Sequence, residues 1–391
     1  MADHTDLIGR ADVDDLDEIL AITNTNVDEV AHTVRAEADT IFTWDYERTR
    51  PALGKLYEKA KHSMWDANDL PWHIDVDQEK VAENNQNQNG FDRHADHTGT
   101  PFEKWGDKEW IQFGVESQNW TLSQFLHGEQ GALICTAQIV ETVPWIDAKY
   151  YAATQVMDEA RHVEVFSRYL DTKLSGHYPI NAHLKMLLDE IIADSRWDMT
   201  YLGMQIMVEG LALAAFGFLH QMTTEPLLKQ LLRQVMSDEA RHVAFGVLSL
   251  QEYYQQLTNA EIRERQEFAF EAAVRMRDRF MQQETWERMG VDVKEAVKAM
   301  QQSPERPIFQ AMLFSKIVPN CKKLGLLDAG DGWLRDRFTE LGVIQFEDWV
   351  DTETEVLEVP DVEVPGLEVP GLEVPSLEVA ARAGQVTGAS L

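Results

Sequence analysis

The chain has 391 residues, of which 67 are Asp or Glu and 35 are Lys or Arg, so its formal net charge is −32. This length, together with 44% hydrophobic residues, supplies enough apolar side chains for a large buried core. The strong negative charge argues against nucleic acid as a partner, because the phosphates would be repelled.

Cysteine content and the first residues favour a cytoplasmic protein. Only Cys135 and Cys321 occur, which does not indicate a disulfide framework and suits a reducing cytosol. The acidic first residues contain no apolar stretch of the kind that marks a secretory signal. The most apolar segment, Gly210–Leu219, is about half as long as a membrane span, so we expect no span.

Residues 1–114 are expected to form an N-terminal extension of helices and loops. Residues 10–70 are predicted to be helical, and Asp14 and Asp15 are suitable caps for the first helix. Residues 73–104 are polar and contain an Asn-Gly pair, which predicts an irregular loop.

Residues 115–255 contain a repeated motif. The string Asp-Glu-Ala-Arg-His-Val occurs at Asp158–Val163 and again at Asp238–Val243. Each copy contains Glu-x-x-His, which places a carboxylate and an imidazole one helical turn apart on the same face. A single Glu-x-x-His carries little information, whereas two identical copies indicate a shared site.

A further Glu lies 30 positions before each motif Glu, since Glu129 precedes Glu159 and Glu209 precedes Glu239. A break near the middle of each interval divides it into two helical arms of about 20 Å, at ~1.5 Å per residue. The two Glu of each pair therefore return to the same height in an antiparallel hairpin. Packing the two hairpins together makes one site.

Glu209 is the strongest evidence for metal binding, because no other charge occurs between Gly203 and Leu219. An isolated buried carboxylate costs several kcal/mol or becomes protonated, whereas four carboxylates around two divalent cations are neutralised. Four Glu and two His in this order are the ligand set of a carboxylate-bridged two-metal centre in a four-helix bundle. The mixed imidazole and carboxylate set suits iron or manganese. The predicted ligands are Glu129, Glu159, His162, Glu209, Glu239 and His242.

Residues 256–350 are expected to form a C-terminal helical extension, with helices within 259–300 and 305–346. No strand pattern of any length is present in the sequence. The predicted fold is therefore all-α, a four-helix bundle with extra helices at both ends.

Residues 351–391 are predicted to be a disordered acidic tail. Leu-Glu-Val-Pro units place a proline at positions 360, 365, 370 and 375, which prevents a helix and a regular strand ladder. Two roles stay open, a solubilising tail or a multivalent segment that docks to a protein partner or a protein shell.

On these motifs the chain resembles the ferritin-like di-iron carboxylate oxidoreductases. That superfamily includes monooxygenase hydroxylases, ribonucleotide reductase small subunits, acyl-carrier-protein desaturases and arylamine N-oxygenases. The resemblance implies two ligand sets with some bridging Glu: Glu129, Glu159 and His162 for one metal ion, and Glu209, Glu239 and His242 for the other. It also implies that two Asp hold the His rings across the bundle and that two Arg offset their charge: Asp158, Asp238, Arg161 and Arg241.

Three positions depart from the better-known branches. Phe166 lies four residues after the first His, where reductase small subunits keep a radical tyrosine, so a stable tyrosyl radical there is excluded. Leu213 replaces the threonine of the multicomponent hydroxylases, and Val235 replaces an additional His of the N-oxygenases. The superfamily is indicated, and the branch is left open.

The expected activity is oxygen activation, because six protein ligands leave positions open on two metal ions for dioxygen and substrate. Apolar side chains would exclude water, and the candidates are Phe125, Phe166, Leu213, Phe216 and Phe245. We expect an oxidase or oxygenase with two Fe, or with Mn and Fe, that acts on a small or acyl-type organic substrate.

Two alternatives stay open, an iron-storage or metal-dependent ligand-binding protein and a radical-generating subunit of a partner enzyme. The long segments on both sides of the bundle favour an oxygenase, because a minimal storage bundle needs neither. The expected partners are an electron donor, such as a reductase or a ferredoxin, and a second copy of the chain in a homodimer.

Overall fold

The computed structural model describes residues 8–10, 12–84, 87–88 and 91–349. The predicted tail, residues 351–391, lies outside the described residues. Within them the protein is α-helical, as the sequence predicts, apart from a two-residue antiparallel ladder of β1 (Asn87–Gln88) and β2 (Phe91–Asp92).

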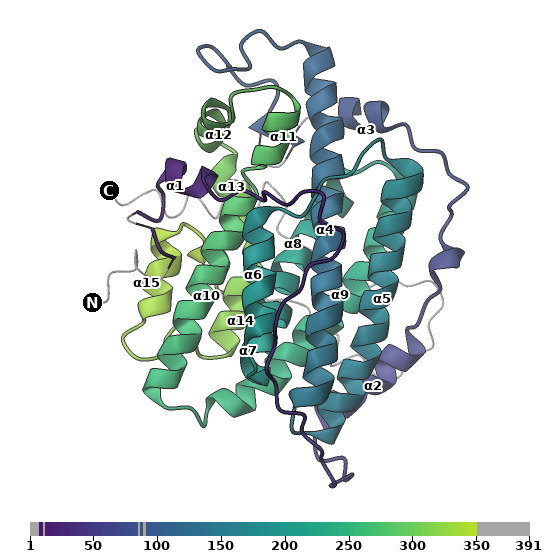
Figure 1. The fold of residues 1–391 in the computed structure, drawn as a ribbon, viewed down its shortest axis with the longest axis vertical. Coiled ribbons are helices and arrows are strands. Elements are labelled where there is room, and N and C mark those ends of the chain that lie inside the picture. Colours follow the sequence, from purple (N-terminus) through teal and green to yellow (C-terminus); the bar gives the residue numbers. More distant parts are fainter. Residues whose placement is uncertain (1–7, 11, 85–86, 89–90, 350–391) are drawn as a thin grey trace.

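Four long helical segments form the bundle that the sequence predicts, and the all-α fold class is confirmed (Figure 1). The first two are α4 (Asp107–Thr142) and α5 (Ile146–Lys173), and the fourth is α9 (Pro226–Tyr254). The third is continuous and consists of α7 (Trp197–Tyr201), the π-helical segment η2 (Leu202–Val208) and α8 (Glu209–Met222).

Local sequence signals set the turns of the two hairpins. Pro144 lies in the short connection between α4 and α5, where it prevents α4 from continuing. At the other turn, Pro226 occupies the first position of α9, and the Glu225 carboxylate accepts the N–H of Leu227 at 2.7 Å. These turns return each chain segment along its neighbour, as the spacing of the four Glu requires.

The third bundle helix is the most deeply buried element. A Cβ on Gly246 of α9 would lie 2.7 Å from Cβ of Gln205, so the absence of a side chain at Gly246 allows close packing. The whole helix, Trp197–Met222, has the length and apolar composition to cross a membrane, and 89% of its most apolar window is buried inside the protein. It is therefore longer than the Gly210–Leu219 segment suggests, and it serves as the core helix of the bundle.

Further helices cover one side of the bundle (Figure 1). They are α6 (Ala182–Ala193), α10 (Asn259–Arg279), α11 (Gln283–Arg288), α12 (Val293–Gln301), α13 (Arg306–Leu313), α14 (Ile317–Lys323), α15 (Trp333–Glu340) and the short 3-10 helix η3 (Ile344–Phe346). Apolar residues of α10, α13, α14 and α15 belong to the same hydrophobic cluster as those of the bundle. The C-terminal extension thus shares one core with the metal-binding region, and α4 begins eight residues before the proposed boundary at 115.

The N-terminal region differs from the helical prediction for residues 10–70. Its helices are α1 (Leu16–Leu20), α2 (Pro51–His62), the 3-10 helix η1 (Ala67–Asp69) and, beyond that range, α3 (Gln78–Asn84). Asp15 caps α1, as the sequence indicates. Residues 22–49, named the arm here, contain neither helix nor strand. Many of them are β-branched, which lowers helix propensity, and a helix without a packed face is only marginally stable.

Candidate metal centre

The predicted ligands come together in the middle of the bundle. They are Glu129 on α4, Glu159 and His162 on α5, Glu209 at the start of α8, and Glu239 and His242 on α9. Each is at most 5% exposed. Ligand atoms of Glu129, Glu159, His162 and Glu239 lie within 4.8 Å of one another, and so do those of Glu159, Glu209, Glu239 and His242. Glu159 and Glu239 belong to both groups, so these two carboxylates are placed to bridge.

The π-helical segment η2 places Glu209. The N–H of Glu209 donates to the carbonyl of Met204, five residues earlier, instead of to the residue four earlier as in an α-helix. The extra residue in this turn rotates Glu209 relative to the preceding helix. Such π segments are frequent at functional sites, and no signal in the sequence indicates this one.

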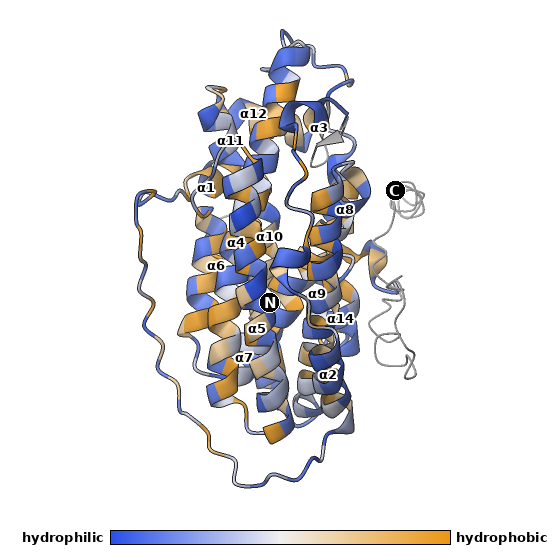
Figure 2. Cartoon of the chain, turned by 90° about the vertical axis from the view of Figure 1, so that its right-hand side faces the viewer, coloured by the Kyte–Doolittle hydropathy of each residue, from blue (hydrophilic) through white to orange (hydrophobic). Residues whose placement is uncertain are grey.

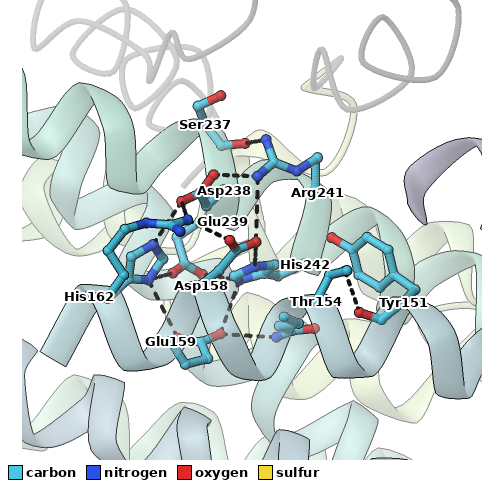
Figure 3. Close-up of polar contacts among 12 residues, drawn as sticks. Tyr151, Thr154, Asp158, Glu159, His162, Ser237, Asp238, Glu239, Arg241 and His242 are labelled. Carbon is cyan, nitrogen blue, oxygen red and sulfur yellow. Dashed lines mark hydrogen bonds and ion pairs between the residues drawn. The ribbon is translucent and has the colours of Figure 1, made fainter. Parts of the chain in front are cut away.

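Each histidine is held by an aspartate from the other repeat (Figure 3). His162 Nε2 donates to Asp238 Oδ2 at 3.1 Å, and His242 Nε2 donates to Asp158 Oδ2 at 3.3 Å. The other ring nitrogen then faces the carboxylates, since His162 Nδ1 lies 3.1 Å from Glu239 Oε1. The aspartates therefore fix the tautomer in which Nδ1 offers a lone pair to the centre of the site.

Two arginines link the aspartates to each other. Arg161 Nη2 donates to both Asp158 and Asp238, at 2.9 Å for the second, and Arg241 donates to Asp238. Arg241 also lies 3.5 Å from Asp158. Burial opposes ionisation of Asp238, but the charges of Arg241 and His162 hold the pKa of Asp238 well below its usual range. The buried network therefore contains positive and negative side chains whose charges offset one another.

In the absence of cations the carboxylate cluster needs protons. Burial and the charge of Glu239 raise the pKa of Glu129 to about 8, and burial with the charge of Glu159 raises the pKa of Glu209 well above its ordinary value. Burial opposes protonation of His162, but its carboxylate neighbours raise its pKa well above 6.5. Divalent cations can displace such protons, because they supply the same compensation.

Several atoms of the cluster also lack hydrogen-bond partners among the described residues. They are Glu159 Oε2, Glu209 Oε2, both carboxylate oxygens of Glu239, and His242 Nδ1. Buried polar atoms without partners are costly, whereas carboxylate oxygens and imidazole nitrogens are the ligands that iron and manganese accept. The residues present therefore fit a cofactor of two metal ions.

Gln155 is a member of the site that the sequence analysis missed. Its Nε2 donates to Glu159 Oε1 at 3.1 Å and to Glu209 Oε1 at 3.0 Å, so one amide joins both hairpins. Its position one turn before Glu159 on the same helical face could have indicated it. The equivalent position of the second repeat is Val235, so the two halves of the site differ here.

Trp65 connects the site to the outer part of the protein and was also missed. Its Nε1–H donates to Asp238 Oδ2 at 2.8 Å, and Asp238 in turn accepts from His162. The Arg161 guanidinium lies 4.6 Å from the centre of the partly buried Trp65 ring. Trp65, Asp238 and His162 thus form a continuous hydrogen-bonded path into the cluster.

A cavity reaches the candidate ligands, and neither Asp158 nor Asp238 is among the residues that line it. This inner cavity, with about 340 Å³ of atom-free space, is lined by Glu129, Glu209 and Glu239 together with Phe125 and Phe216. A larger outer cavity of about 750 Å³ is mostly apolar and shares Phe125 with the inner cavity. Phe125 therefore stands between the two cavities.

The five pocket candidates divide into two groups. Phe125 packs edge-on against Phe216 at 4.6 Å between ring centres, and Phe166 stacks on Phe216 at 5.7 Å, so these three form one wall. Phe245 instead packs against Tyr151 at 4.4 Å. Of the five candidates, Phe125 and Phe216 line these cavities, whereas Phe166, Phe245 and the buried Leu213 do not.

Arg279 is the one cationic side chain among the described residues that line the inner cavity. It is 5% exposed, and no hydrogen bond or ion pair joins its guanidinium to another described residue, although the guanidinium lies 4.9 Å from the centre of the Phe280 ring. Burial lowers its pKa to about 10. The next residue, Phe280, lines the outer cavity, so the end of α10 lies where the two cavities meet. The charge of Arg279 is therefore available to a ligand.

Comparisons with known proteins agree with this site. Residues 137–325 match the family model described as p-aminobenzoate N-oxygenase AurF, and this range contains every predicted ligand except Glu129. No curated protein sequence matches the chain at a significant level.

Among solved structures, the chain is similar to an R2-like ligand-binding oxidase with an aerobically reconstituted metal cofactor after photoconversion. The identity is 16% and the TM-score 0.46, over 71% of this chain and 94% of that chain. Two variants of an R2-like ligand-binding oxidase with an anaerobically reconstituted Mn/Fe cofactor show 19% identity with a TM-score of 0.44, and 18% with 0.46, at the same coverage.

The four-helix bundle brings together four Glu and two His, and a family model matches residues 137–325. The chain thus has the buried carboxylate and histidine cluster on which its resemblance to the ferritin-like di-iron carboxylate superfamily rests.

Proposed function

We propose that this protein is an oxidase or oxygenase that activates dioxygen at two iron ions, or at one manganese and one iron ion, and oxidises a small organic substrate. The inner cavity carries this proposal, because Glu129, Glu209 and Glu239 line it directly. A metal site with only a structural role is closed by its protein ligands, whereas a catalytic site keeps access for a reactant.

In this proposal each metal ion would be held by one Glu and one His of its own and by two Glu that belong to both groups. The separate pairs are Glu129 with His162 and Glu209 with His242, and the shared residues are Glu159 and Glu239. When bound, two such ions would supply electrons for the reduction of dioxygen and so provide the oxidising power for a C–H or N–H bond. The wall of Phe125, Phe166 and Phe216 excludes bulk water from that reaction.

The cavities favour a substrate with an anionic group attached to an apolar body. Arg279 offers a buried positive charge without an acidic partner among the described residues, and the adjoining outer cavity is mostly apolar. The matched family model is named for an enzyme of p-aminobenzoate, a compound with one carboxylate, a ring and an amine. We therefore propose a small organic acid whose N–H or C–H bond is oxidised while Arg279 binds its carboxylate.

Electrons from a donor protein would enter through Trp65. The hydrogen bonds from Trp65 to Asp238 and from His162 to Asp238 provide a covalent and hydrogen-bonded route into the cluster. The same route favours a second candidate function, a subunit that exchanges an electron or radical with a partner enzyme. Phe166 occupies the position at which the reductase small subunits carry a radical tyrosine. Because a phenylalanine cannot form that radical, this residue favours the oxygenase.

A cytoplasmic location, the residue boundaries of the domains and a docking role for the Leu-Glu-Val-Pro tail rest on the sequence alone and are part of this proposal. A reductase or a ferredoxin as the electron donor is also part of this proposal.

Metal analysis and oxygen uptake test the proposal. Protein from cells supplied with iron and manganese should contain about two metal ions per chain, and Glu239→Ala should lose at least one. Glu164→Ala, on an exposed position of α5, is the matched control and should keep both. After anaerobic loading with Fe(II), the wild-type protein should consume oxygen faster than free Fe(II) does. Wild-type protein without metal, or loaded protein that consumes no more oxygen than free Fe(II), would contradict the proposal.

A further inference from the structure

Gln155 makes the two halves of the candidate metal centre unequal. Its side chain is buried, and its Nε2 donates to Glu159 Oε1 at 3.1 Å and to Glu209 Oε1 at 3.0 Å. A primary amide has two N–H bonds and an ionised carboxylate can only accept, so one N–H serves each carboxylate. The repeat places the buried Val235 at the equivalent position of the second motif, and a valine side chain has no donor.

Both hydrogen bonds of Gln155 go to members of one of the two ligand groups. The first group, named the α4 position after the helix of its own Glu, consists of Glu129, Glu159, His162 and Glu239. The second group, named the α8 position in the same way, consists of Glu159, Glu209, Glu239 and His242. Glu209 belongs to the α8 position alone, and Glu159 belongs to both.

The shared carboxylate of Glu159 receives its hydrogen bond on the side of the α8 position (Figure 3). Glu159 Oε1, which accepts from Gln155, lies 3.1 Å from His242 Nδ1. Glu159 Oε2 lies on the other side, 3.5 Å from His162 Nδ1. Glu159 Oε2 and Glu209 Oε2 have no hydrogen-bond partner among the described residues. Gln155 therefore engages one oxygen of each carboxylate and leaves the second oxygen of each free for a cation.

The surroundings make these two hydrogen bonds strong restraints. Hydrophobic and hydrophilic residues both occur along the bundle helices in Figure 2, and the hydrophobic ones include Tyr151, Phe166 and Val235 of the main core cluster. A hydrogen bond to a charged acceptor in an apolar interior is stronger than the same bond in water. The amide also joins α5 to the start of α8, so it fixes the carboxylates of two hairpins relative to each other.

We propose that Gln155 is a positioning residue that makes the α8 position bind its metal ion more tightly than the α4 position does. Each histidine already has its aspartate, so that support is equal in the two positions, whereas the amide serves only one. Hydrogen-bond partners of metal ligands change metal affinity by about 10–100-fold. The α8 position therefore fills first, which gives a centre of two different metals a defined arrangement. This inference rests on the proposed two-metal centre.

Titration of the metal-free full-length protein with Mn(II) tests the order of filling. Free Mn(II) is measured by electron paramagnetic resonance, which gives both dissociation constants without an activity assay. The wild type should bind two ions with dissociation constants that differ by about tenfold or more. Gln155→Met keeps a side chain of similar length but removes both N–H donors, so it should bring the two constants to within about threefold. Val235→Ala, the matched control in the second repeat, removes no hydrogen bond and should keep the wild-type difference.

Variants with one position disabled show which position Gln155 supports. Glu129→Gln disables the α4 position, and Glu209→Gln disables the α8 position. The Glu129→Gln protein should bind its single Mn(II) about tenfold more tightly than the Glu209→Gln protein does, a comparison that keeps Gln155 intact. Adding Gln155→Met should weaken binding about tenfold in the Glu129→Gln protein and less than about threefold in the Glu209→Gln protein. Circular dichroism checks that each variant is folded.

The outcomes separate this inference from the proposed function. Equal affinities of the two single-position proteins, or an equal loss in both when Gln155 is replaced, would refute the inference. A wild type that binds no Mn(II) would refute the two-metal centre and the inference together. Two unequal positions in a protein that consumes no oxygen would refute the proposed function and leave the role of Gln155 standing.

Discussion

Asp238 is the residue whose replacement the structure predicts in most detail. Four donors converge on its two oxygens: Trp65 at 2.8 Å, Arg161 at 2.9 Å and His162 at 3.1 Å reach Oδ2, and Arg241 reaches Oδ1. Asp238→Asn replaces one oxygen with an amide N–H. In either orientation of the new side chain, its amide N–H group points at one or more of the four donor groups. The substitution also removes a buried negative charge.

Two costs follow from this geometry. Removing one partner of a buried ion pair destabilises a protein by about 3–5 kcal/mol, because the opposite charge stays buried. The His162 tautomer is also no longer fixed, and such changes lower metal affinity by about 10–100-fold. At about 1.4 kcal/mol per tenfold, this second cost corresponds to about 1.4–2.8 kcal/mol.

Urea unfolding of the metal-free protein and titration with Fe(II) under anaerobic conditions measure the two costs separately. Asp158→Asn should weaken metal binding in the same way through His242, which it holds. Asp171→Asn is the control, because its side chain is 60% exposed and its contact to His177 is a surface ion pair of little value. If Asp238→Asn unfolded within about 0.5 kcal/mol of the wild type and bound Fe(II) equally well, the proposed role of this network would be wrong.

Three further predictions concern single side chains. Arg279→Leu should stabilise the protein or leave its unfolding free energy unchanged, because the substitution removes a buried charge that has no acidic partner. It should also weaken the binding of benzoate measured by calorimetry. Loss of stability with unchanged benzoate binding would contradict the role of Arg279. Trp65→Phe should keep the metal content and slow reduction of the oxidised protein by dithionite-reduced ferredoxin at least tenfold, whereas an unchanged rate would exclude this electron route. Burial, with Glu190 and Glu267 nearby, raises the pKa of Glu271 from 4.5 to about 7 in the folded state. The folded state therefore binds the proton more tightly than the unfolded state does. The unfolding free energy of the wild type relative to that of Glu271→Gln should fall as pH rises from 4.5 to 7 and stay level above pH 7. If this difference in free energy did not change with pH over that range, the raised pKa would be wrong.

The sequence alone could predict the residues that local periodicity fixes. The repeated Glu-x-x-His motif places two pairs of side chains by helical geometry, and the equal 30-residue offsets bring Glu129 and Glu209 to the same level. These relations hold within one helix or one hairpin, so no long-range packing is needed to see them.

The remaining site residues depend on packing between distant segments. Trp65 meets Asp238 across 173 positions, and Arg279 reaches the inner cavity only because α10 packs against the bundle. The helical prediction for the arm was wrong for a related reason. Its Val and Ile residues recur at helical spacing, but no helix packs on them within the described chain, and periodicity alone does not stabilise a helix.

The crosswise support of the histidines has a consequence for how the protein matures. His162 is completed by Asp238 and His242 by Asp158, across 76 and 84 positions. During synthesis, the first hairpin therefore presents Glu129, Glu159 and His162 before the carboxylates that complete their site have been translated. Metal ions bound at that stage would be held by an unfinished set, and firm retention begins only when the second hairpin docks. Metal retention thus reports that both halves of the bundle have joined in the correct register.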